Sequence, residues 1–145
     1  MDMTRPANRR ALGPLGAAVL LAATLPAPAA SASAEPGAPA AGERTDRNKR
    51  IARTAMRAYG WGSERQFRCL ERLWERESGW NENAHNSSSG AHGIPQALPG
   101  SKMAAAGSNW RSNARTQILW GLKYIKGRHG TPCGAWSHFQ SKGWY

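Results

Sequence analysis

The chain has 145 residues and a formal net charge of +11 at pH 7, from 20 Lys and Arg against 9 Asp and Glu. This length allows one domain of ordinary size with a tail, and excludes a large multidomain assembly within the chain. Two cysteines and four scattered histidines lack metal-ligand spacing, so we predict no metal site and no cofactor.

Residues 1–34 resemble a secretory signal peptide. Three arginines precede the apolar run ALGPLGAAVLLAATLP, and the small residues of ASASAE offer cleavage after Ala32 or Ala34. A membrane anchor is the alternative, but Gly and Pro shorten the run below the length of a spanning helix. We therefore expect a secreted protein, extracellular or associated with the cell wall, with no membrane span after cleavage.

Residues 35–44 are rich in Pro, Ala and Gly and are predicted to be a linker, followed by one domain over residues 45–145. The first helix is predicted from about Asp46 to Tyr59. Ser63 opens a second helix through the capping-box sequence SERQ, and this helix should end near Ser78.

Asn, Ser, Gly and Pro dominate residues 80–100, which are predicted to form a long loop or a small irregular β-hairpin. Ser101 should cap a short helix, Asn113 a longer one and Thr131 a last short one. The prediction is a small, mostly helical domain, of the lysozyme-like α+β class, with an elaborate loop after its second helix.

The second helix separates into two faces when its residues are placed at about 100° per residue. One face alternates Glu and Arg, with Glu64 and Arg68 as a predicted i,i+4 ion pair, and should be solvated. The other face is apolar and should be buried; it comprises Phe67, Cys69, Leu70, Leu73 and Trp74.

Glu77 falls near the middle of the apolar face, at the C-terminal end of the helix. Burial and the helix dipole should both raise its pKa. A carboxylic acid that stays protonated near neutral pH is what a general acid requires. The alternative is that Glu77 lies past the last ordered turn and faces solvent, or pairs with an arginine.

The acidic residues end early in the chain. No Asp or Glu follows Glu82, so a glycosidase with two catalytic carboxylates would have only Glu82 as a convenient partner for Glu77. If Glu77 is catalytic, we therefore expect it to act without a carboxylate nucleophile.

Seven tryptophans are many for a chain of 145 residues, and indole faces suit the apolar faces of sugar rings. We expect Trp74, Trp120 and Trp136 in the core and two or three of the others along a groove. In an oxidising compartment Cys69 and Cys133 would most simply form one disulfide.

Residues 45–145 resemble the lytic transglycosylases with a goose-type-lysozyme-like fold, most closely the small secreted actinobacterial proteins of that superfamily. The resemblance rests on RESGWNENAHNSSSGAHGIPQ, GIPQALPGSKMAAAG, TQILWGLKYI and PCGAWSHFQSKGWY, which occur in this order. It implies that Glu77 is the catalytic acid and base, that Ser78 supports it by hydrogen bonding and that Gln96 lines the substrate groove. It also matches Gly90, Ala91 and Gly93 to loop positions where the backbone comes close to its neighbours.

The chain departs from the family at two places. Pro95 stands in GIPQ where the wider family has Gly-Leu-Met-Gln, which removes a backbone donor. Phe139 and Gln140 fall where the family has a Tyr-Asn pair, and the family tyrosine hydroxyl lies near the catalytic glutamate. His138 is a candidate replacement; an ordinary helix-surface histidine is the alternative. The residues assigned to substrate binding are Ser78, Trp80, Gln96, His138 and Phe139.

The resemblance implies cleavage of peptidoglycan between N-acetylmuramic acid and N-acetylglucosamine, with 1,6-anhydro products. A lysozyme-type hydrolase and a catalytically weak wall-binding protein are the alternatives. We expect a monomer whose partners are glycan strands and the anionic wall surface. The basic residues are spread among the helices, and with the signal peptide this argues against nucleic acid as a partner.

Overall fold

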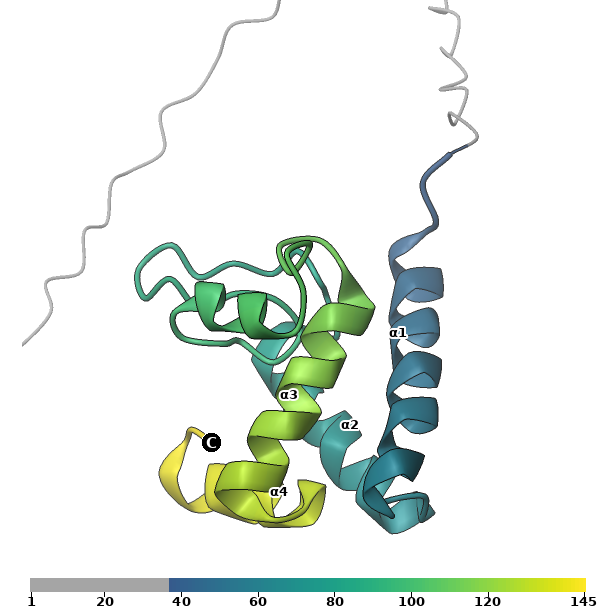
Figure 1. The fold of residues 1–145 in the computed structure, drawn as a ribbon, viewed down its shortest axis with the longest axis vertical. Helices are drawn as coiled ribbons and strands as arrows, with labels where there is room; N and C mark the ends of the chain where they lie inside the picture. The colour runs from purple at the N-terminus through teal and green to yellow at the C-terminus, as the bar shows by residue number, and fades with distance from the viewer. Residues whose placement is uncertain (1–36) are drawn as a thin grey trace, which may run out of the picture. The chain divides into compact units, whose positions relative to one another are not determined.

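The computed structural model describes residues 37–145, so the predicted signal peptide lies outside the described residues. Within that range the chain is mostly helical, as predicted (Figure 1). The elements in chain order are α1 (Ala41–Met56), η1 (Arg57–Tyr59), α2 (Glu64–Ser78), η2 (Gly100–Ala105), α3 (Ala114–His129) and α4 (Pro132–Lys142), where η marks a 3₁₀ helix.

Three helix starts follow the predicted caps. The side chains of Ser63, Asn113 and Thr131 accept hydrogen bonds from backbone N–H groups in the first turns of α2, α3 and α4. Each supplies an acceptor for a donor that has no partner within the helix. The predicted Ser101 cap is wrong, because η2 begins one residue earlier and has no side-chain cap.

Helix α1 begins earlier than predicted, so residues 41–44 are helical and are not part of a linker. The side chain of Glu43 accepts a hydrogen bond from the N–H of Ala40 at 3.2 Å. A carboxylate in the first turn also interacts favourably with the helix dipole. These local contacts extend the helix into a stretch whose composition resembles a linker.

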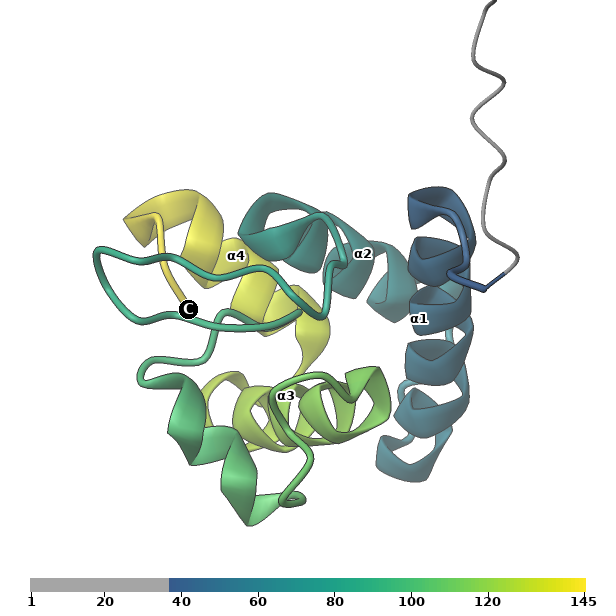
Figure 2. The same ribbon diagram turned by 90° about the horizontal axis from the view of Figure 1, so that it is seen from above.

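Helix α2 packs against α4, and α3 packs against both α4 and α1 (Figure 2). The predicted apolar face of α2 is buried, and the disulfide between Cys69 and Cys133 ties α2 to α4 as predicted. On the opposite face Glu64 pairs with Arg53 of α1, at 2.7 Å, and not with Arg68 as predicted. The fully buried side chains include Met56, Leu70, Leu73, Trp74, Trp80, Ile94, Ile118, Leu122 and Ile125.

The segment between α2 and η2 is a loop without an extended strand. Within it, His92 forms isolated antiparallel bridges with His85 and Ala97. The fully buried side chain of Gln117 on α3 holds the loop: its Nε2 donates to Glu82 O and Trp110 O, and its Oε1 accepts from the N–H of Ile94. One amide thus ties three points of irregular backbone to a helix.

Within residues 37–145 no helix is both long and apolar enough to cross a bilayer. The same residues contain no group of three or more His, Cys, Asp or Glu side chains placed to hold a metal ion.

Candidate active site

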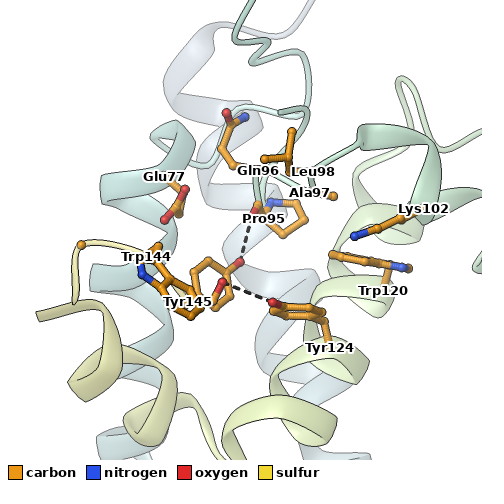
Figure 3. A pocket seen from close by; sticks show the side chains of 11 residues that line it. Glu77, Pro95, Gln96, Ala97, Leu98, Lys102, Trp120, Tyr124, Trp144 and Tyr145 are labelled. Carbon is orange, nitrogen blue, oxygen red and sulfur yellow. Dashed lines mark hydrogen bonds between the residues drawn. The ribbon is translucent and has the colours of Figure 1, made fainter. Parts of the chain in front are cut away.

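A cavity of about 430 Å³ lies where the end of α2, the loop after it, α3 and the C-terminal segment meet (Figure 3). Four segments that are distant in sequence supply its walls. The lining residues are Glu77, Pro95, Gln96, Ala97, Leu98, Lys102, Trp120, Tyr124, Gly143, Trp144 and Tyr145.

Glu77 occupies the last turn of α2 and is half-buried. Burial raises the pKa of its carboxyl from 4.5 to about 7, since desolvation disfavours the charged form. No cation offsets this effect: the three salt bridges within residues 37–145 engage Glu64, Glu71 and Glu82. Glu77 therefore neither pairs with an arginine nor faces open solvent, and it is protonated in a large fraction of molecules at neutral pH.

Glu82 is held away from the cavity. Its carboxylate accepts hydrogen bonds from Arg47 and from the buried Asn48 side chain, both at 3.0 Å, and it is 5% exposed. These contacts tie the loop to α1 and occupy both oxygens of the Glu82 carboxylate. Among the residues that line the cavity, Glu77 thus carries the one acidic side chain.

Tyr145 closes the cavity beside Glu77. Its hydroxyl accepts a hydrogen bond from Trp74 Nε1 and donates one to Pro95 O, both at 2.9 Å. The residue is half-buried, and its hydroxyl is the enclosed end. The pKa of this phenol lies well above 10 because burial and then the negative charge of Glu77 disfavour the phenolate. Tyr145 is therefore a neutral donor and acceptor at any physiological pH.

Tyr145 was not among the residues assigned from sequence. The departure from the family pattern at Phe139 predicted that a tyrosine contact was lost or replaced, with His138 as the candidate. Gly143 ends α4 with φ 78°, and the chain then turns back so that Tyr145 reaches the cavity. In the sequence, the pair of aromatic residues that follows Gly143, Trp144 and Tyr145, was the feature that could have indicated this tyrosine.

The opposite wall is an aromatic platform. The rings of Trp120 and Tyr124 on α3 are stacked, with centroids 5.2 Å apart and planes 16° from parallel. Trp120 is half-buried and lines the cavity, so the prediction that it lies in the core is wrong. Trp136 is also half-buried, and it packs against the core.

Trp144, which is 54% exposed, lines the cavity near Glu77. Lys102 extends toward the cavity above Trp120 (Figure 3).

Gln96, which the resemblance assigns to the substrate groove, lines the cavity together with Glu77, and Figure 3 shows it above Glu77. Its backbone is left-handed, with φ 51°, which is uncommon for a residue other than glycine. The side-chain amide donates to Gly93 O at 2.9 Å and to Ala84 O at 3.3 Å. These bonds hold the turn that presents Gln96 to the cavity.

Ser78 and Trp80 have structural roles that differ from the prediction. The Ser78 hydroxyl donates to Ile94 O at 2.8 Å, which fixes the loop to α2, and its hydrogen bonds do not include Glu77. Trp80 is fully buried, with its ring edge on Trp74 at 5.2 Å. Gly79 and Trp80 are both left-handed, so the chain reverses and carries this indole into the core.

His138 and Phe139 do not line the cavity with Glu77. The His138 ring packs against Trp144 and His129, with centroids 4.5 Å and 5.0 Å apart, and its Nε2 is buried without a partner among the described residues. Phe139 stacks on Trp136 at 5.7 Å. Both are on α4, before the turn that brings Tyr145 to the site.

Comparison of the chain with protein-family models, with curated proteins and with solved structures finds no significant match.

Proposed function

We propose that this protein cleaves peptidoglycan as a lytic transglycosylase, acting on the β-1,4 bond between N-acetylmuramic acid and N-acetylglucosamine. The observation that carries the proposal is Glu77: a carboxyl with a pKa of about 7, and the one acidic side chain that lines the cavity. A group with this pKa can donate and accept a proton near neutral pH.

In the first step, protonated Glu77 donates its proton to the glycosidic oxygen. The bond to the muramic acid C1 breaks, the N-acetylglucosamine leaves as an alcohol and positive charge develops on the ring. The carboxylate of Glu77 then removes the proton from the C6 hydroxyl of the same muramic acid, and O6 attacks C1. The product is a 1,6-anhydro ring, and Glu77 is protonated again.

These reaction steps need no carboxylate nucleophile, which agrees with the hydrogen bonds that hold Glu82 to Arg47 and Asn48. The enclosed Tyr145 hydroxyl fixes the wall next to Glu77 through Pro95. The aromatic faces of Trp120 and Trp144 suit sugar rings, and the amide of Gln96 suits their polar substituents. Without residues 1–34, which carry three Arg and one Asp, the net charge falls from +11 to +9, and this charge would favour retention on the anionic wall.

The test is Glu77→Gln, with Glu75→Gln as the matched control because Glu75 is exposed on the same helix. We expect Glu77→Gln to abolish release of soluble fragments from purified peptidoglycan and Glu75→Gln to leave it intact. Retained cleavage by Glu77→Gln would refute the catalytic assignment.

Mass spectrometry of the fragments separates the alternatives. Anhydro ends support the transglycosylase, whereas reducing ends that carry an added water indicate a lysozyme-type hydrolase at the same site. Binding to the wall without any released fragment would indicate a non-enzymatic wall-binding protein.

A further inference from the structure

A second hollow, of about 490 Å³, adjoins the cavity that contains Glu77. The two share the stacked rings of Trp120 and Tyr124, which line both. A substrate in the first cavity could therefore extend a substituent across this aromatic pair. The second hollow is lined by Tyr59, Ala105, Ala106, Leu119, Trp120, Lys123 and Tyr124.

The two hollows differ in chemistry. The first combines aromatic walls with Glu77, Gln96 and Lys102, which can satisfy the hydroxyls and amides of a sugar. The second presents the methyl and aromatic surfaces of alanine, leucine and ring side chains, and its one charged group is Lys123. It therefore offers fewer polar groups to the hydroxyls and amides of a sugar than the first hollow does.

Lys123 is exposed on α3, and the salt bridges of residues 37–145 engage Arg47, Lys49 and Arg53 instead. Its ammonium group therefore has no acidic partner within the described residues. An apolar surface with one such cation at its edge complements a short chain with small apolar side chains and a carboxylate.

We propose that the second hollow binds the acidic peptide carried by the muramic acid of the substrate, with its alanyl methyl groups on Leu119 and Ala106 and a carboxylate at Lys123. This inference rests on the proposed function. It makes the enzyme selective for strands that bear peptides over strands from which the peptides have been removed, and it assigns Lys123 as a specificity-determining residue.

The test compares cleavage of peptide-bearing glycan strands with cleavage of the same strands after an amidase has removed the peptides. The variants are Lys123→Gln, which removes the cation, and Ala106→Glu, which fills the hollow and adds an opposing charge. Their controls are Arg115→Gln, on the same helix as Lys123, and Ala104→Glu, on the 3₁₀ helix η2 that ends just before Ala106; both positions are exposed and outside the two linings.

We expect wild type to have a lower KM for peptide-bearing strands. Lys123→Gln should reduce this preference about fivefold, as for the loss of one partly exposed ion pair, and Ala106→Glu should reduce it further. Arg115→Gln and Ala104→Glu should keep the wild-type preference. Equal KM values of wild type for the two substrates, or a full preference in Lys123→Gln, would overturn the inference while leaving the proposed function intact.

If wild type cleaves neither substrate, the proposed function fails and the hollow is tested by binding alone. Isothermal titration calorimetry with the acidic peptide that the amidase releases would then show saturable binding, and Lys123→Gln should weaken this binding. No binding, or equal binding by wild type and Lys123→Gln, overturns the inference.

Discussion

The hydroxyl of Tyr145 donates a 2.9 Å hydrogen bond to the carbonyl oxygen of Pro95, a residue 50 positions earlier in the chain. The same hydroxyl accepts from Trp74, so one phenol joins α2, the long loop and the C-terminal segment. These three segments enclose the space beside Glu77. The raised pKa of Glu77 is therefore a consequence of tertiary packing, beyond its position on the helix.

Removing the Tyr145 hydroxyl should weaken the fold. In Tyr145→Phe the indole N–H of Trp74 loses its acceptor and Pro95 O loses its donor, which should lower the free energy of unfolding by about 1–3 kcal/mol. Denaturant unfolding followed by tryptophan fluorescence measures the change. Tyr59→Phe is the control, since the Tyr59 hydroxyl has no hydrogen bond within residues 37–145; an equal effect of both substitutions would contradict this role for Tyr145.

Activity should depend on protonation of Glu77. The acid form is required for the first step, and burial sets the pKa of Glu77 to about 7. We therefore expect kcat/KM to fall by about tenfold per pH unit above pH 7, because the protonated fraction of the free enzyme falls at that rate. A pH–rate profile on purified peptidoglycan measures this. A profile that stays flat from pH 6 to pH 9 would be incompatible with Glu77 as the general acid.

The same carboxyl should make stability fall as pH rises. Its folded pKa of about 7 lies above the ordinary value of 4.5, so between these values the folded state retains a proton that the unfolded state has released. The free energy of unfolding should decrease through this window, by at most about 3 kcal/mol before allowance for partial exposure of the carboxyl.

Glu77→Gln should remove that penalty because Gln is neutral at every pH. We expect its Tm to exceed that of wild type at pH 8 and to approach it at pH 4, measured by thermal unfolding in matched buffers. Glu75→Gln, at an exposed position, should show no such pH-dependent gain. A Glu77→Gln variant no more stable than wild type at pH 8 would show that the carboxyl is not desolvated.

Two loop glycines should differ in their tolerance of alanine. Both have positive φ, 80° at Gly90 and 76° at Gly93, which costs an L-residue about 1 kcal/mol. A Cβ at Gly93 would also overlap the side chain of Gln117, which is buried and hydrogen-bonded, whereas a Cβ at Gly90 meets open space. We expect Gly93→Ala to lose about 2–4 kcal/mol of stability and Gly90→Ala about 1 kcal/mol. Equal losses of stability in denaturant unfolding would show that the Gln117 side chain can move aside without lowering the free energy of unfolding.

The disulfide should contribute substantially to the stability of this small domain. Cys69 and Cys133 are 64 residues apart in sequence, and closing a loop of that length stabilises by about 4 kcal/mol in the chain-entropy model. The double substitution Cys69→Ala, Cys133→Ala should lower the midpoint of denaturant unfolding accordingly. Wild type in a reducing buffer should shift by a similar amount, and no shift in either would contradict the assignment.

Local chemistry explains what could be predicted from sequence. A cap needs one side chain and the next few backbone groups, so Ser63, Asn113 and Thr131 identified three helix starts. Helical periodicity likewise separated the buried and exposed faces of α2, because the face on which a residue lies depends only on its position within the helix. It also placed Glu77 among apolar neighbours, and the raised pKa agrees with that position.

The tertiary structure decided which side chains share the cavity with Glu77. Trp80 enters the core because two left-handed residues reverse the chain after α2, while Trp120 stays half-buried because the cavity opens on its side of α3. Tyr145 reaches Pro95 and Trp74 after the turn at Gly143, and Phe139 does not reach the cavity. Such contacts join residues 50 to 71 positions apart. They depend on how whole elements pack, which no pattern within a single helix or loop encodes.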